Sequence, residues 1–231
     1  MTRNRTTRSA TLALLVLATL PGLASASETS TDYVSFKIVA ARLHADGMDL
    51  SARPGIGSFV SGKETDSDTA GTIAYGHRFA NDWRVEGEYA FKQSAEFTSG
   101  SSRFSGSYNH HQVEATRLMA NLYRDLPMGE KFHLYGSVGL GVSRIESSGW
   151  QGNASRTFGR HTQDNLSWAL GLGAGYRINP RLSVEAGYRW INQGNIESGY
   201  NRFSNVRGLV DEQMRLDLAT GEAHLGLSFH F

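Results

Sequence analysis

Residues 222–231, at the C-terminal end, constrain the fold more than any other segment of the chain. Apolar side chains occupy every second position there, from Ala223 to the final Phe231, and polar or small residues fill the positions between them. Successive side chains of a β-strand point to opposite faces, so the segment is a strand with one apolar and one polar face. A strand that ends in phenylalanine on its apolar face suits lipid, where an aromatic side chain lies at the membrane interface.

The N-terminal residues have the pattern of a secretory signal peptide. Three arginines precede a short apolar run at residues 12–20, and the small residues Ala24, Ser25 and Ala26 follow it. The run is shorter than the roughly 20 residues that a membrane-spanning helix requires. We therefore expect residues 1–26 to be cleaved as a signal peptide, which leaves a mature domain at residues 27–231.

Composition excludes several classes of protein. The formal net charge is +1, with 23 Lys and Arg against 22 Asp and Glu, so nothing indicates a nucleic-acid partner. The chain has no cysteine, which excludes disulfides, a lipid-modified N-terminal cysteine and thiolate zinc sites. Only 4 prolines occur, and this scarcity favours long strands because proline cannot donate to a sheet ladder.

Alternation of apolar and polar residues predicts strands along the whole mature chain. Their lengths fit the roughly 9–11 tilted residues that cross a bilayer as a strand. The eight expected strands are residues 33–44, 69–79, 83–97, 113–124, 132–144, 166–177, 181–190 and 219–231. We therefore predict an all-β fold, an eight-stranded antiparallel up-and-down transmembrane β-barrel.

The expected connections alternate between long and short. The short ones are residues 80–82, 126–131 and 178–180, and the long ones are residues 45–68, 98–112, 145–165 and 191–218. Alternate connections of an up-and-down barrel emerge on the same side, and outer-membrane barrels have short periplasmic turns and long extracellular loops. The pattern therefore places both chain ends in the periplasm and four long loops on the cell surface.

A soluble eight-stranded barrel of the lipocalin type is the rival fold, and it would place the apolar faces inside. Two features favour the membrane barrel. The polar faces carry charges that suit a narrow interior, and aromatic residues such as Trp83, Tyr176 and Trp190 lie near strand ends, as they do in interfacial girdles.

Short motifs in the expected strands are similar to those of a known family. They are YVSFKI at residues 33–38, IAYGHRF at 73–79, RVEGEY at 84–89, LMANLYRD at 118–125, LYGSVGLG at 134–141, GYRW at 187–190, and the final Phe231. The chain resembles the small outer-membrane proteins of the opacity type and, more broadly, the OmpA/OmpX-like barrels.

The resemblance implies a Gram-negative outer-membrane location, with outer-membrane lipid and lipopolysaccharide as surroundings. It also implies that the barrel-assembly machinery reads a C-terminal signal, for which Phe229 and Phe231 are the candidates.

Inward-facing charges form the best-defined candidate site. Strand parity places four basic and four acidic side chains inside the barrel, namely Lys37, Arg84, Glu86, Glu88, Arg117, Glu185, Arg189 and Glu222. Side chains nearly fill an eight-stranded barrel, and unpaired charges there are costly, so we expect a paired structural network. The alternative is a gate that opens for small ions.

Other motifs do not predict a catalytic, cofactor or metal site. Glycine repeats at residues 136–141 and 171–175 lie inside strands, where they make room, and lack the strand–turn–helix unit of a dinucleotide-binding loop. The pair His110-His111 has no cysteine partners or tight helical ligand spacing. Ser228 and His230 point inward at the periplasmic end without a third group to orient them.

The sequence therefore favours a non-enzymatic outer-membrane barrel of the opacity or porin-like type. Its four surface loops would mediate adhesion or another surface interaction, with a host or matrix ligand as partner. Two alternatives stay open, a narrow passive pore and an outer-membrane enzyme that modifies lipid A.

Overall fold

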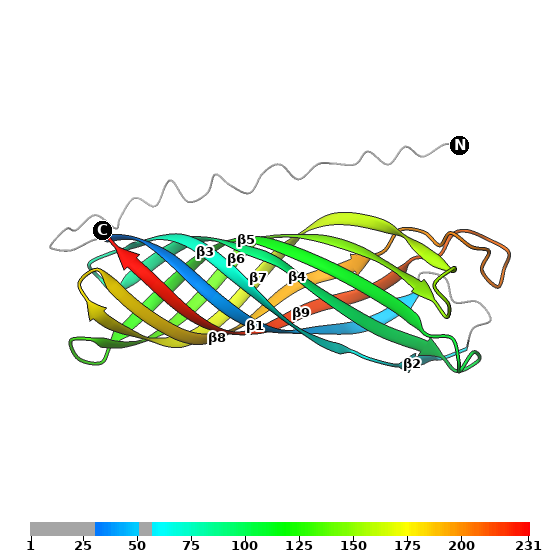
Figure 1. Cartoon of the computed structure of the whole chain (residues 1–231), viewed down its shortest axis with the longest axis horizontal. Helices are drawn as coiled ribbons and strands as arrows, with labels where there is room; N and C mark the ends of the chain where they lie inside the picture. Colours follow the sequence, from blue (N-terminus) through cyan, green and yellow to red (C-terminus); the bar gives the residue numbers. More distant parts are fainter. Residues whose placement is uncertain (1–30, 51–56) are drawn as a thin grey trace.

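Antiparallel strands form most of the chain that the computed structural model describes, which is residues 31–50 and 57–231 (Figure 1). The expected signal peptide lies outside these ranges. Eight strands form the wall of an elongated barrel: β1 (Thr31–Leu50), β3 (Thr65–Arg78), β4 (Trp83–Ser101), β5 (Asn109–Pro127), β6 (Phe132–Gln151), β7 (Thr157–Asn179), β8 (Leu182–Glu197) and β9 (Met214–His230). The short β2 (Phe59–Ser61) pairs with the end of β4. Within the described ranges, no helix is long and apolar enough to span a bilayer.

The barrel is closed by pairing between its first and last strands. Each strand of the wall is antiparallel to its neighbours in sequence, and β9 pairs with β1 from His230 opposite Tyr33 to Met214 opposite Leu50. The N–H of Phe231 also donates to the carbonyl oxygen of Asp32, at 2.9 Å. The predicted eight-stranded up-and-down barrel is confirmed, and the C-terminus lies at the end that carries the short turns (Figure 1).

An exposed apolar belt surrounds the half of the barrel nearest the short turns. Leu166 and Leu172 in this belt are 66% and 67% exposed. A continuous apolar surface of this extent would be unfavourable in water. Its exposed apolar side chains include Phe36, Ile38, Ile73, Tyr75, Tyr89, Phe91, Leu118, Leu122, Phe132, Leu134, Val138, Leu140, Trp168, Leu170, Tyr188, Trp190, Leu225 and Phe229. The side chains of the belt are those that the alternation in the sequence predicts to face outward, and an apolar outer face suits the hydrocarbon core of a bilayer.

The strands continue well beyond this belt, and here the sequence prediction is wrong. β1 runs to Leu50 instead of ending at residue 44, and β7 begins at Thr157 instead of residue 166. Most of the expected connection at residues 145–165 is therefore strand, and strand extends into both ends of the other three expected long connections. The connections left at this end include residues 102–108, 152–156 and 198–213.

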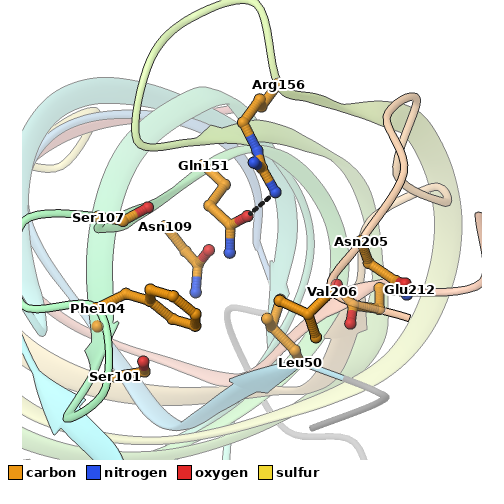
Figure 2. Close-up of a pocket in the computed structure, with 11 residues that line it drawn as sticks. Leu50, Ser101, Phe104, Ser107, Asn109, Gln151, Arg156, Asn205, Val206 and Glu212 are labelled. Atoms are coloured by element: carbon orange, nitrogen blue, oxygen red, sulfur yellow. Dashed lines mark hydrogen bonds between the residues drawn. The ribbon is translucent and has the colours of Figure 1, made fainter. Parts of the chain in front are cut away.

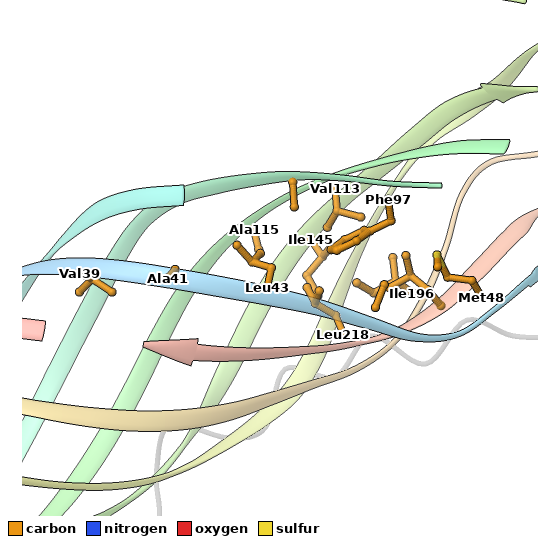
Figure 3. Close-up of a cluster of buried hydrophobic side chains, with 13 residues drawn as sticks. Val39, Ala41, Leu43, Met48, Phe97, Val113, Ala115, Ile145, Ile196 and Leu218 are labelled. Atoms are coloured by element: carbon orange, nitrogen blue, oxygen red, sulfur yellow. The ribbon is translucent and has the colours of Figure 1, made fainter. Parts of the chain in front are cut away.

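Beyond the belt, the strands exchange the polarity of their two faces. Outward positions become polar, as at Arg42 on β1 and Asp164 on β7, while inward positions become apolar. The buried apolar side chains there form one cluster, which we call the apolar plug (Figure 3): Val39, Ala41, Leu43, Ala45, Met48, Ala95, Phe97, Val113, Ala115, Ile145, Ile196, Leu216 and Leu218. Beyond the belt, the barrel thus has an apolar interior and a polar exterior, as a soluble lipocalin-type barrel does. Within the belt, it has the reverse arrangement of a membrane barrel.

The wall is interrupted between β3 and β4 above the belt. Their backbone ladder covers only Thr72 to Arg78 against Arg84 to Ala90. Higher up, Asp66 accepts a hydrogen bond from the N–H of Glu96 at 2.9 Å, and Asp68 accepts one from the N–H of Ser94 at 2.7 Å.

Each carboxylate also accepts from the N–H of the residue that follows it, at 3.1 Å for Asp66 and 2.8 Å for Asp68. Two side chains thus replace the missing backbone pairing on both strands, because buried or edge backbone groups require partners. We call this feature the carboxylate seam.

Deletion of residues 225–231 should abolish the compact, heat-modifiable form on gels, because β9 must pair with both β1 and β8 to leave no open edge in lipid. Phe231→Ser alone should mainly lower assembly yield in cells, with less effect on refolding in detergent. A heat-modifiable species from the deletion variant would show that β9 is not needed for closure.

Leu170→Arg should reduce folding into lipid vesicles, at a cost of roughly 2–4 kcal/mol, because it places a charge in mid-bilayer. Thr162→Arg, outward on the same strand but beyond the belt, is the matched control and should fold normally. Equal folding yields for the two variants would contradict the position of the belt.

The double substitution Asp66→Asn/Asp68→Asn should lower the hydrogen-exchange protection of the Ser94 and Glu96 amides at least tenfold. Burial opposes ionisation of Asp66, but hydrogen bonds from Lys63 and from backbone N–H groups hold its pKa below the ordinary value. Its contribution to stability is therefore present above about pH 4 and lost as the pH falls through the lowered pKa. Asp164→Asn on the outer wall is the control, and equal protection in both variants would contradict the bridging role.

Candidate functional site

The interior of the membrane belt holds all eight charged side chains singled out from the sequence. Each of them is at most 6% exposed. Towards the short turns, the Lys37 ammonium lies 2.9 Å from Glu86, 3.3 Å from Glu88 and 3.4 Å from Glu185. One cation from β1 thus joins carboxylates from β4 and β8, on different parts of the wall.

A second group of charges lies nearer the apolar plug. Arg189 on β8 bridges Glu88 at 2.5 Å and Glu222 at 2.6 Å, while Arg117 on β5 pairs with the same Glu222. Gln93, which the sequence reading missed, donates to Glu222 at 2.8 Å and accepts from Arg117 at 2.8 Å. Glu88 therefore connects the two groups into one network.

The structure adds a fifth acidic position that the sequence did not predict. Asp125 accepts from Arg84, with 3.0 Å between Nε and Oδ2, and also pairs with Arg78. It lies one residue beyond the expected end of its strand, where the predicted alternation assigns no face. With Asp125 and Arg78 included, the network contains equal numbers of cations and carboxylates.

Tyrosine hydroxyls add further hydrogen bonds to the network. Tyr33 and Tyr123 both donate to Glu86, at 2.8 and 2.9 Å. Inward glycines make room for further rings, since a Cβ at Gly173 would lie 2.4 Å from Tyr135 and one at Gly175 would lie 2.3 Å from His133. These glycines serve packing, as expected from their place inside strands.

The serine and histidine side chains considered from the sequence as catalytic or metal-binding groups do not lie together. His230 contacts the hydroxyl of Ser183 at 2.9 Å rather than that of Ser228. His110 stacks on Trp150 outside the barrel, while His111 bonds Ser147 inside it. In the part of the chain that the structure describes, no three His, Asp or Glu side chains are grouped to hold a metal ion.

A cavity of about 100 Å³ opens at the end of the barrel opposite the short turns (Figure 2). It is built from strand ends and from the connections at residues 102–108 and 198–213. The side chains around it are Leu50, Ser101, Phe104, Ser107, Asn109, Gln151, Arg156, Asn205, Val206 and Glu212. Sequence reasoning missed this site because its residues come from distant segments that no local pattern connects.

The cavity wall contains a deeply buried acid and three unpaired polar atoms. Glu212 is only 3% exposed, and burial together with the nearby Asp211 raises its pKa. Within the described residues, Asn109 Oδ1, Ser101 Oγ and Arg156 Nε are buried without a hydrogen-bond partner. Groups of this kind make the cavity chemically able to receive a polar ligand.

A charge network of this kind should respond strongly to loss of one partner. Arg117→Met and Glu222→Gln should each destabilise the barrel by about 3–5 kcal/mol, because each leaves a buried charge without its partner. The double variant should cost less than the sum of the two, as measured by denaturant unfolding in detergent micelles. Arg144→Met on the outer wall is the control; additive effects of the two interior changes would contradict direct coupling.

Comparison with known proteins agrees with this architecture. The family model described as "Outer membrane protein beta-barrel domain" matches residues 10–231. The crystal structure of the outer-membrane protein OprG from Pseudomonas aeruginosa is similar, with a TM-score of 0.58 and 17% sequence identity over 87% of this chain and 96% of that chain. Neisserial surface protein A has a TM-score of 0.50 and 16% identity over 88% of this chain and 100% of that chain. No curated protein matches the sequence.

Proposed function

The chain belongs to the family of outer-membrane protein β-barrel domains, and we propose that it is a closed, non-enzymatic barrel that binds a partner at its extracellular end. Its place is the Gram-negative outer membrane, where the apolar belt contacts lipid and lipopolysaccharide. The partner would be a host or matrix component, and the function adhesion or a related surface interaction. Phe229 and Phe231 remain our candidates for the signal that the assembly machinery reads.

The observation that carries this proposal is the exchange of faces beyond the belt. A barrel that only had to cross the bilayer could end its strands there. Here the strands continue into water as a wall supported from inside by the apolar plug. The extension holds the connections at residues 102–108 and 198–213 at a fixed distance from the membrane, and rigid scaffolds of this kind commonly position binding loops.

The filled interior supports a closed barrel rather than a narrow pore. An ion entering from the cell surface would have to leave water and pass the plug side chains, among them Phe97, Ile145 and Leu218, which are at most 1% exposed. It would then meet a network in which the charges are already paired. The arrangement of Ser228 and His230 likewise offers no oriented nucleophile and base.

The proposal is tested by displaying the chain on a laboratory bacterium and replacing residues 203–210 with a Gly/Ser linker of equal length. Adhesion to host cells or matrix-coated surfaces should fall to background in this variant. A Gly/Ser replacement of residues 128–131, in the periplasmic turn, should leave adhesion unchanged. In planar bilayers the purified protein should give no conductance above the bare membrane; channel openings would overturn the closed-barrel assignment.

A further inference from the structure

The wall of the extracellular cavity contains buried polar atoms that lack a hydrogen-bond partner. Asn109 is 6% exposed and Ser101 is 9% exposed, yet Asn109 Oδ1 and Ser101 Oγ have no partner among the described residues. A buried acceptor or hydroxyl that is left unpaired is costly, so its presence in the wall of a cavity requires an explanation. Both residues line the cavity, where a ligand could supply the missing hydrogen bonds (Figure 2).

The polar lining is dominated by amides and hydroxyls, which both donate and accept. Arg156 donates from Nη2 to Gln151 Oε1 at 2.9 Å, and its guanidinium lies 4.3 Å from the centre of the Phe203 ring. These contacts orient the Gln151 amide at the cavity wall and engage Nη2, while Arg156 Nε is buried without a partner among the described residues and can donate one hydrogen bond to a ligand hydroxyl. Because Nη2 already donates to Gln151, the guanidinium is poorly placed to clamp a carboxylate or a sulfate through two parallel hydrogen bonds.

The charge beside the cavity also disfavours an anion. The Glu212 carboxyl is buried at the wall, and ionisation of this group would repel a second negative charge in a poorly solvated site. As a carboxylate it accepts a hydrogen bond from a hydroxyl, and in its protonated form it donates one. Both states are compatible with a neutral, hydroxyl-bearing ligand.

The rest of the lining is apolar and faces these polar groups. Phe104, Leu50 and Val206 border the cavity from the strand end of β1 and from the two connections at the mouth (Figure 2). The volume of about 100 Å³ is smaller than the ~150 Å³ cavity that encloses benzene, so this cavity can hold only part of a substituted ring, and its opening towards solvent leaves space for the rest. A single ring with one apolar face and hydroxyl groups at its edge could insert that edge into such a site.

We propose that this cavity binds a neutral pyranose, such as the terminal sugar of a glycan. Its hydroxyl groups would bond Asn109, Ser101 and Gln151, and its C–H face would contact Phe104. The inference rests on the proposed function, because it names the ligand class for the same extracellular end of the barrel.

The test uses the full chain refolded in lipid nanodiscs, with methyl glycosides of glucose, galactose, mannose and N-acetylglucosamine as probes. Saturation-transfer NMR and calorimetry should detect binding of at least one of them. The 6-sulfate of that glycoside and the zwitterion alanine should bind at least tenfold more weakly. Absence of binding by every neutral glycoside, or tighter binding of the sulfate or of alanine, would overturn the inference.

Two variants localise the binding. Ser101→Ala/Asn109→Leu replaces the unpaired polar atoms with apolar groups, so it should lower affinity at least tenfold without lowering the thermal unfolding midpoint. Val206→Trp narrows the mouth from a position that is 53% exposed and should weaken binding even if the first variant folds poorly. Asn81→Leu, in a periplasmic turn, is the matched control. Binding that both cavity variants leave unchanged would place the sugar elsewhere and overturn the inference.

The outcome is separable from that of the proposed function. If replacement of residues 203–210 abolishes adhesion but no sugar binds, the proposed surface interaction is supported and the sugar-binding inference is wrong. If sugar binds in a way that depends on Asn109 but the cells show no adhesion, the sugar-binding inference is supported and the proposed adhesion is wrong.

Discussion

The need to pair every backbone hydrogen-bonding group inside lipid governs this structure. Hydrocarbon offers no partner to a free N–H or C=O, so a sheet that crosses the membrane must close on itself. The register of β1 against β9 accomplishes this and places the C-terminus beside the start of β1. Once the sheet is closed, alternate side chains must face either lipid or a narrow bore. The apolar belt and the interior charges therefore both follow from closure of the sheet.

The narrow bore then decides how charge is accommodated. Lys37, Arg189 and Glu222 each bond more than one partner, and these pairs connect strands from different parts of the wall. Such a network stabilises the barrel only while it is complete, because each buried charge depends on the others. Inward glycines allow Tyr135 and His133 to pack beside it, so that side chains occupy the bore.

Beyond the bilayer the constraint relaxes, and the wall changes with it. Water can solvate an imperfect edge, so β3 and β4 separate there and the carboxylates of Asp66 and Asp68 bridge the seam. The faces exchange polarity, since an apolar plug and a polar exterior are the stable arrangement in water. The result is a platform that carries the mouth connections and the cavity, in whose wall Asn109 and Ser101 have unpaired polar atoms.

The sequence alone determined the number, order and parity of the strands, because a period of two with an apolar face is a local property that lipid contact demands. It also assigned the eight charged side chains to the inner face, since side chains of a strand alternate between its two faces. It did not determine where the strands end, because alternation continues through Arg42 and Asp164 with reversed polarity and no longer resembles a lipid-facing strand. Only the tertiary structure brought Asn109, Arg156 and Glu212 around one cavity, because their proximity depends on closure and register across the whole barrel.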